Sequence, residues 1–369
     1  MFIETLFRIA LGLKLALFTA FVSTLIAVTP AAARDVQCTG EDLMGRIGFE
    51  HPEAMARIDA RAAAMPNGIG RHWRVEKKGV VPSHLFGTIH ITDPRATTVD
   101  PAVMERIRKA RTLLVEIAEI GDNKATEAAM AKHFAKIAYL DGTTLADRMD
   151  PRVLERIRPM FVRRMMLARP QEAGDPATAD QMWTMMGVRM RPWTLLGMFA
   201  MPACEAARQG AGGTIQDVLL IRTAREAGVP VEGLETIGEQ VDVMAGMPEP
   251  LMLAALADVA RMGPLMDDMF ETMVSLYETG DIARIWAMMS DPIMATFGDG
   301  SSDADAAQAM YAAFQARVID ERNANMVERM TAHLEKGNAF VAVGALHMPG
   351  EKGIVEMLRQ RGWTVTAVE

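Results

Sequence analysis

The sequence lacks two motifs that often identify an active site. It contains no Gly-x-Ser-x-Gly motif, and its serines lie in predicted turns or helices without a partner pattern, which argues against a serine hydrolase. It also contains no phosphate-binding loop of the Walker type, because residues 210–213, though glycine-rich, follow a predicted helix and not a strand. Other residue types must therefore carry any chemistry.

Positive charge is in short supply. The chain has 39 Lys and Arg against 47 Asp and Glu, a net charge of -8. Residues 1–33 contain Glu4, Arg8 and Lys14, so the remaining chain has 37 basic and 46 acidic groups. Nucleic acids and anionic membrane surfaces favour basic patches. Neither is expected as a partner.

Long hydrophobic runs are also scarce. One uncharged run, residues 15–28, follows a basic lead-in and precedes Ala31, Ala32 and Ala33. It is shorter than the ~20 residues that span a bilayer. We therefore predict a cleaved signal peptide over residues 1–33 rather than an anchor, and a periplasmic or secreted mature protein. No later run is long enough to predict a stable membrane span.

The sequence has only two cysteines, Cys38 and Cys204. Both follow the predicted signal peptide, and an even pair in an oxidising compartment favours a disulfide. A disulfide would exclude either residue as a catalytic nucleophile. The alternative is two free, buried thiols.

Apolar runs typical of strands alternate with helical patterns. A strand, a helix over residues 101–110 and a second strand predict a βαβ unit with parallel strands. We expect one helix over residues 41–64, a helical insertion or lid over roughly 123–225, and further helices over 237–336. The predicted strands are residues 71–77, 84–90, 111–118, 230–235, 339–346 and 363–368. The expectation is one α/β domain over residues 34–369.

Methionine is abundant, with 31 residues clustered in the predicted helices. Such clusters can bind soft metals. The favoured interpretation is adaptable packing, because methionine fills irregular gaps between helices.

Two histidines end apolar runs of the same form, Gly87-x-x-His90 and Gly344-x-x-His347. A parallel strand delivers its last side chains to the carboxyl edge of a sheet, where open α/β folds bind ligands. The glycine in each motif permits close approach of backbone or ligand. The repetition favours one shared site, and two unrelated strand-end histidines are the alternative.

Two carboxylates, Glu116 and Glu235, interrupt otherwise apolar strands. A lone carboxylate there is costly unless it is paired, coordinated or exposed. With His90 and His347 they could bind a divalent cation such as zinc, manganese or cobalt and leave positions open for water. A carboxylate not bound to the ion could then act as general base. The alternative is solvent-facing glutamates and core histidines.

Arg322 lies on a predicted helix that leads into the second histidine motif. Its guanidinium could hold a carboxylate or a developing oxyanion. An ordinary salt-bridged helix residue is the alternative.

These segments together resemble the TraB/GumN family (TraB/PrgY/GumN), which is related to the Tiki metalloproteases. The resemblance extends over roughly residues 69–368 in order. It rests on residues 85–90, the strand around Glu116, residues 231–236 with Gln240, residues 321–323, and residues 343–347 followed by Gly350 and Gly353.

The resemblance implies an EreA/ChaN/Tiki-like α/β fold, with a mixed, mostly parallel sheet and a large helical insertion. It implies that His90 and His347 are metal ligands or catalytic groups, that Glu116 and Glu235 are acid/base groups or ligands, and that Arg322 is a stabiliser. In Tiki proteins this arrangement serves manganese- or cobalt-dependent peptide hydrolysis.

Two classes of function remain open at this point. One is an exported metal-dependent hydrolase, a peptidase with a peptide or protein substrate. The other is a non-catalytic periplasmic protein that binds a peptide, a metal or a haem-like ligand. The sequence leaves the metal, the substrate and the oligomeric state open.

Overall fold

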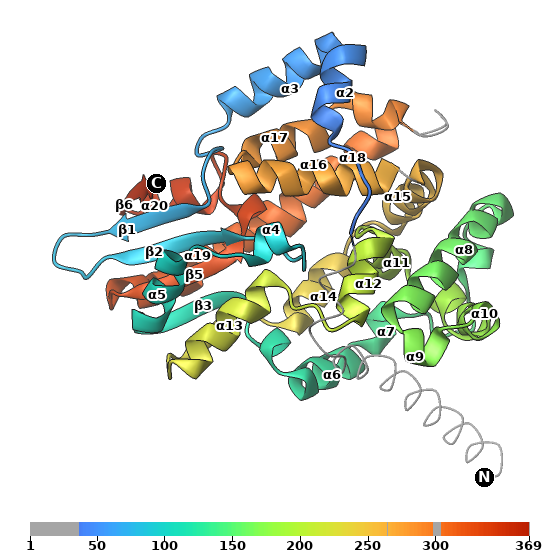
Figure 1. The fold of residues 1–369 in the computed structure, drawn as a ribbon, viewed down its shortest axis with the longest axis horizontal. Helices are drawn as coiled ribbons and strands as arrows, with labels where there is room; N and C mark the ends of the chain where they lie inside the picture. The colour runs from blue at the N-terminus through green and yellow to red at the C-terminus, as the bar shows by residue number, and fades with distance from the viewer. Residues whose placement is uncertain (1–36, 264, 298–303, 369) are drawn as a thin grey trace.

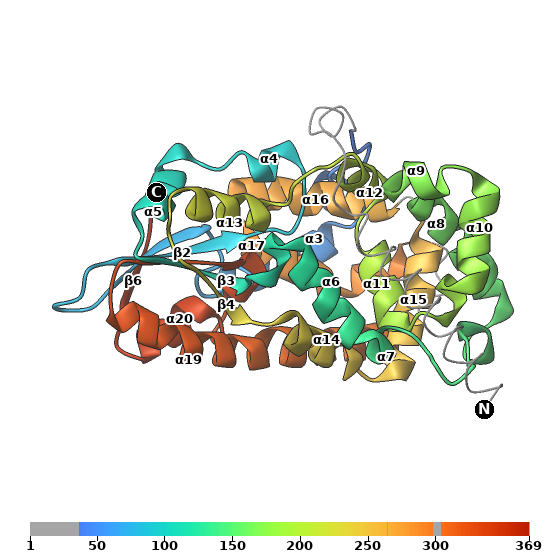
Figure 2. The same ribbon diagram turned by 90° about the horizontal axis from the view of Figure 1, so that it is seen from below.

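A computed structural model describes residues 37–263, 265–297 and 304–368. The predicted signal peptide, residues 1–33, lies outside the described residues. The described chain forms a six-stranded sheet with helices on both faces, and a group of helices lies beyond one end of the sheet (Figure 1, Figure 2).

The sheet is mixed and mostly parallel, as predicted. Its order is β4-β3-β5-β2-β1-β6. The first four strands in this order run parallel, and β1 pairs antiparallel with both β2 and β6. The strands are β1 (His72–Glu76), β2 (Ser83–Thr88), β3 (Thr112–Ile117), β4 (Val231–Glu235), β5 (Ala339–Gly344) and β6 (Thr364–Ala367). The parallel strands therefore end at a common edge.

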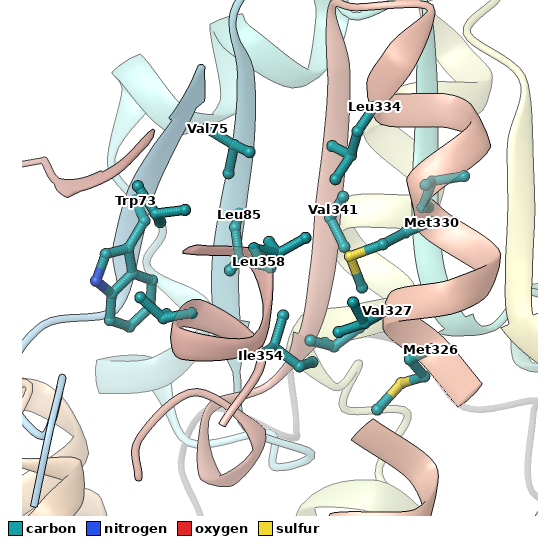
Figure 3. Close-up of a cluster of buried hydrophobic side chains, with 14 of the residues drawn as sticks. Trp73, Val75, Leu85, Met326, Val327, Met330, Leu334, Val341, Ile354 and Leu358 are labelled. Carbon is teal, nitrogen blue, oxygen red and sulfur yellow. The ribbon is translucent and has the colours of Figure 1, made fainter. Parts of the chain in front are cut away.

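Both faces of the central strand β5 are covered, and all six of its residues are buried. Val341 packs against α19 (Glu321–Glu335) and α20 (Ile354–Gln360) on one face, in a cluster with Leu85 and Met330 (Figure 3). Phe340 faces α5 (Pro101–Lys109) and α13 (Gln216–Glu226) on the other. This double burial explains why the strand is a continuous apolar run.

The predicted helical insertion is present and has its own apolar core. Phe161, Trp183 and Leu195 are buried together there with Leu256 from a later helix. The helices of this segment are α6 (Asn123–Lys132), α7 (Phe134–Ile137), α8 (Pro151–Ala168), α9 (Pro170–Ala173), α10 (Pro176–Met185), α11 (Pro192–Phe199) and α12 (Ala203–Gly210). Many begin with proline at the first helical position, where its missing N–H costs nothing.

The remaining helices flank the sheet and the insertion. The segment predicted as one helix over residues 41–64 is instead two helices that meet at His51, because Pro52 has no N–H to continue the first. The two helices at His51 are α2 (Leu43–Glu50) and α3 (Pro52–Ala64). The other flanking helices are α4 (Pro94–Thr97), α14 (Ile237–Ala245), α15 (Glu249–Met262), α16 (Leu265–Thr279), α17 (Ile282–Met289) and α18 (Ala304–Phe314).

A disulfide joins Cys38 to Cys204, so the prediction of a disulfide is confirmed. It ties the segment before α2 to the helical insertion across 166 positions of sequence.

Over the described part of the chain, no single helix is both long and apolar enough to cross a membrane. The bent pair α14 and α15 passes that test only when the two helices are taken together.

Two histidines away from the sheet's carboxyl edge predict a loss of stability in acid. His72 Nε2 and His84 Nδ1 share a hydrogen bond of 3.0 Å between β1 and β2. Burial, followed by neighbouring positive groups such as Arg106, lowers the pKa of each imidazole to about 4. The unfolded chain takes up these protons from about pH 6.5 downward, whereas the folded protein does not take them up until about pH 4. Stability is therefore present above pH 6.5 and falls as the pH drops towards 4.

We expect each imidazole to cost at most about 3 kcal/mol between pH 7 and pH 4, with a smaller cost for His84 because its side chain is partly exposed. Urea unfolding at several pH values measures the effect. The double variant His72→Gln/His84→Gln should flatten the pH dependence, and His333→Gln should not. Equal slopes for wild type and the double variant would contradict the prediction.

Candidate functional site

The parallel pairing of β2 with β5 brings the two histidine motifs together. In this register Gly87 faces Val343 and Thr88 faces Gly344. His90 follows β2 in a loop, and His347 ends a short 3-10 helix (Ala345–His347) that follows β5. The motifs are therefore neighbours in space although 257 positions separate the two histidines.

Each motif glycine permits a close approach that any larger residue would block. A Cβ at Gly87 would lie 3.0 Å from Cα of Ala345, so this glycine makes room for the turn that carries His347. A Cβ at Gly344 would lie 2.9 Å from Oε1 of Glu116 and 3.5 Å from Nε2 of His90. The repeated glycine is thus a packing requirement of the site.

Glu116 lies between the two imidazoles. Its Oε1 is 3.8 Å from Nε2 of His90 and 3.8 Å from Nε2 of His347, and it accepts the Gly344 N–H at 2.6 Å. Burial alone would raise the pKa of this carboxyl, but the imidazoles, Arg322 and the Gly344 N–H outweigh it and hold the pKa well below its usual range. Glu116 is therefore an anion at neutral pH.

Arg322 binds both strand glutamates. Its Nη2 donates to Oε2 of Glu116 at 2.7 Å and to Oε2 of Glu235 at 2.7 Å, and its Nε donates to Glu235 at 2.9 Å. Gln240 donates to the same two carboxylates at 3.2 Å. Burial acts to lower the pKa of Arg322, but the two carboxylates overcome it and raise the pKa. The result is a buried guanidinium held between two anions.

His90 is held by a residue that sequence analysis did not select. Its Nδ1–H donates to Oδ2 of Asp217 at 2.8 Å, and Asp217 also accepts the Thr88 hydroxyl at 2.8 Å. The negative charge of Asp217, opposed by burial, raises the pKa of His90 to about 9. About half of the imidazole is exposed, with Nε2 directed toward Glu116. The pKa means that His90 carries a proton at neutral pH that a metal ion must displace.

His347 has a different charge state. Its Nδ1–H donates to Oδ1 of Asn323 at 2.6 Å, so Nε2 carries the lone pair in the neutral ring. Burial lowers the pKa of His347 to about 4, although Glu116 opposes the shift. Nε2 accepts a long hydrogen bond of 3.4 Å from Nη1 of Arg322. At neutral pH the cations beside Glu116 are thus His90 and Arg322, while His347 is neutral and its Nε2 electron pair is engaged only by the long bond from Arg322.

A cavity of about 400 Å³ opens over these groups. Its polar floor contains His90, Glu116, Gln240, Arg322 and His347, and Glu235 lies behind Arg322 outside the lining. The walls are largely apolar and come from segments outside the sheet: Ala200, Met201, Val243, Met244, Met273, Ile285, Phe314, Val318 and Ile319. Such a cavity suits a ligand with an apolar part and a polar group at the floor.

A π-helical turn leads into Arg322. Residues Gln315–Asp320 form this turn between α18 and α19. The Val318 carbonyl of this turn accepts a hydrogen bond of 3.2 Å from Nη1 of Arg322 and so helps to fix the guanidinium. Wide turns of this kind inside α-helices are common at functional sites.

The predicted metal site contains suitable donor residues, but their spacing is too wide for one ion. Over residues 37–263, 265–297 and 304–368, no three His, Cys, Asp or Glu side chains form a group arranged to hold a metal ion. The carboxylate of Glu235 is fully engaged by Arg322 and Gln240. His90, His347 and Glu116 are chemically suitable donors, but their 3.8 Å spacings exceed the roughly 3.0–3.5 Å expected between atoms that each lie about 2.1 Å from one ion.

A comparison with known protein families covers all six strands and both histidines. The sequence profile of the TraB/PrgY/gumN family matches residues 71–367, which include β1 to β6 and every residue of the floor. The chain belongs to the TraB/PrgY/gumN family. The sequence-based assignment is confirmed.

Two curated relatives of this TraB/PrgY/gumN protein come from Danio rerio. "Metalloprotease TIKI2" is 24% identical over 315 residues, which is 79% of this chain and 60% of the relative. "Metalloprotease TIKI1" is 23% identical over 305 residues, 77% of this chain and 60% of the relative. The chain thus spans about 60% of the length of these relatives. No solved structure matches the chain.

The sequence predicted four of the five polar residues of the floor, but not Gln240, and the support Asp217 was not predicted. Asp217 lies in the first turn of α13, where acidic residues are common because they interact favourably with the helix dipole. Its position therefore did not indicate a role in the site. One signal was available, because Asp217 shares the apolar helix face of Leu220, Ile221 and Ala224 at helical spacing. An acid on that face requires a polar partner, and the partners of Asp217 are His90 and the buried Thr88.

Proposed function

We propose that this protein is an exported metal-dependent hydrolase, with a peptide or protein as substrate. The observation that carries the proposal is the convergence of two imidazole Nε2 atoms on one oxygen of Glu116 at the floor of an apolar-walled cavity. The distant similarity to Tiki metalloproteases supports the same class of reaction. The Cys38–Cys204 disulfide supports an oxidising compartment, in agreement with a periplasmic or secreted protein.

The supports of the histidines favour a role as metal ligands. Each ring uses Nδ1–H to bind an oxygen, Asp217 for His90 and Asn323 for His347, and so directs Nε2 toward Glu116. Metal-binding histidines commonly have their second nitrogen held in this way. We assign His90, His347 and Glu116 as the donor set, with manganese, cobalt or zinc as the candidate ions. When bound, the ion would lower the pKa of a water molecule and polarise the substrate carbonyl.

The other floor residues have roles that their contacts indicate. Glu116, an anion within 3.8 Å of both imidazoles, would bind the ion through Oε1. Arg322 would hold Glu116 in place and keep positive charge beside the developing oxyanion. Glu235 would hold Arg322 from behind and take no direct part. The methionine and phenylalanine walls would bind an apolar part of the substrate and exclude water.

Elemental analysis of the purified mature protein, followed by peptide-library cleavage with added manganese, cobalt or zinc, tests the proposal. We expect about one ion per chain and cleavage that a chelator stops and the same metal restores. Cleavage that chelators leave unchanged would contradict the metal-dependent mechanism.

A binding protein without turnover is the competing function. It predicts that peptides bind with measurable affinity at the cavity and remain intact with every metal. Mass spectrometry of the recovered peptide separates the two, because hydrolysis adds the mass of one water across the two products.

A further inference from the structure

The loop that carries His90 has little regular structure to hold it. β2 ends at Thr88, and α4 begins at Pro94. Between them the Ile89 N–H donates to Oε1 of Gln216 at 3.1 Å, and the Thr92 N–H donates to Oε1 of Glu205 at 2.6 Å. The position of His90 therefore depends on side chains from other elements.

Glu205 is an unusual residue for such a contact. It lies on α12, and its side chain is completely buried. Among the residues that the structure describes, its Oε2 has no hydrogen-bond partner and lies 3.6 Å from Nη1 of Arg208, which also donates to Oδ2 of Asp93 at 2.9 Å. A buried carboxylate with one incompletely satisfied oxygen is costly. Its one short bond holds the loop two residues beyond His90.

The helix that carries Glu205 is tied by a disulfide to the segment before α2. Cys204, the preceding residue, is bonded to Cys38. Shortly after Cys38, the Leu43 N–H donates to Oγ1 of Thr272 on α16 at 2.7 Å. The disulfide therefore fastens α12 to α16, which supplies Met273 to the cavity wall.

We propose that Glu205 is a positioning residue that holds the loop 89–93, and through it His90, from a helix fastened by the Cys38–Cys204 disulfide. Without this contact, His90 would depend on its own bond to Asp217 and on the Ile89–Gln216 hydrogen bond alone. The consequence for metal binding and turnover rests on the function proposed above, whereas the contact itself does not.

Hydrogen–deuterium exchange of the loop tests the contact without any assay of activity. Glu205→Ala removes the acceptor of the Thr92 N–H and should speed exchange in segment 89–93 by about tenfold. Glu205→Gln keeps an acceptor of the same shape and should remain within about twofold of wild type. Glu249→Ala is the matched control, since it deletes a carboxylate bonded to Tyr139 elsewhere among these helices. Its loop exchange should not change.

Metal affinity and kinetics test the consequence. Glu205→Ala should weaken divalent-ion binding by about tenfold, within the range for outer supports of a ligand. It should lower kcat while KM stays near the wild-type value, because the walls from α14 and α16 remain. Glu205→Gln should restore both.

The outcomes separate the two proposals. Faster loop exchange without metal binding or cleavage by wild type would retain the positioning role and reject the hydrolase. Unchanged exchange in Glu205→Ala, or the same acceleration in Glu249→Ala, would overturn the positioning role. If Glu205→Ala does not fold, Cys38→Ser/Cys204→Ser replaces it, and wild-type exchange in segment 89–93 of that variant would overturn the role of the fastened helix.

Discussion

Arg322→Met is expected to destabilise the protein by about 3–5 kcal/mol, the usual cost of removing one partner from a buried ion pair. Arg322 is buried between Glu116 and Glu235, whose side chains are only about 6% and 5% exposed. Methionine fills a similar volume but leaves Glu235 without a cation and Glu116 with only His90, at 3.8 Å. Since domains are stable by roughly 5–15 kcal/mol, much of the folding free energy would be lost. Urea unfolding at pH 7 measures it.

The control for this prediction neutralises the carboxylates in the same background. Arg322→Met combined with Glu116→Gln and Glu235→Gln removes the charges that the guanidinium balances, so most of the lost stability should return. A cost below about 1 kcal/mol for Arg322→Met, as for an exposed pair, would show that the network is solvated. If the triple variant does not regain the lost stability, the cost of Arg322→Met comes from packing and not from unbalanced charge.

His347→Ala is expected to reduce divalent-ion affinity and kcat/KM by at least about 100-fold, the upper range for changes to even the outer supports of a metal ligand. The substitution removes the neutral Nε2 that lies beside Glu116. It leaves Asp217 and His90 unchanged, so a metal-independent reaction based on His90 would survive it. Isothermal titration with manganese, cobalt and zinc, alongside peptide cleavage, measures both losses.

Folding must be separated from chemistry in this variant. His347 is buried, and its removal leaves Oδ1 of Asn323 without a donor, so a loss of about 1–3 kcal/mol is expected. Working well below the melting temperature keeps the variant folded. His333→Ala, on the outer part of α19, is the control and should bind metal as wild type does. Full metal affinity in His347→Ala would remove this residue from the donor set.

The positions of the strands were predictable because buried parallel strands form continuous apolar runs in the sequence. The residues at which the strands end were not predictable. The prediction extended the second strand to residue 90, but β2 ends at Thr88. The Ile89 N–H then turns away from the ladder to Gln216 of α13. A side chain 127 positions distant decides that boundary, and no local pattern contains it.

The site was predictable to the extent that its geometry is local. A glycine three residues before a histidine, at the end of a parallel strand, placed His90 and His347 at one edge. Glu116 and Glu235 looked equivalent in sequence because both interrupt apolar strands. In the structure the two glutamates have different contacts. Glu235 accepts hydrogen bonds from two nitrogens of Arg322, whereas Oε1 of Glu116 makes no bond to Arg322 and lies near the histidines.

The π-helical turn before Arg322 makes the length of the chain at this point as important as its composition. A π turn closes its hydrogen bonds one residue later than an α turn. Deleting one residue from Gln315–Asp320 would close the wide turn to an α-helical one and leave α18 and α19 nearly in phase, because a π turn accommodates one extra residue. The Val318 carbonyl would then return to the helix's own hydrogen bonds and lose its bond to Nη1 of Arg322, while the apolar residues of α19 kept their identity. A comparison of related sequences that counts only matching residue types would miss such a change.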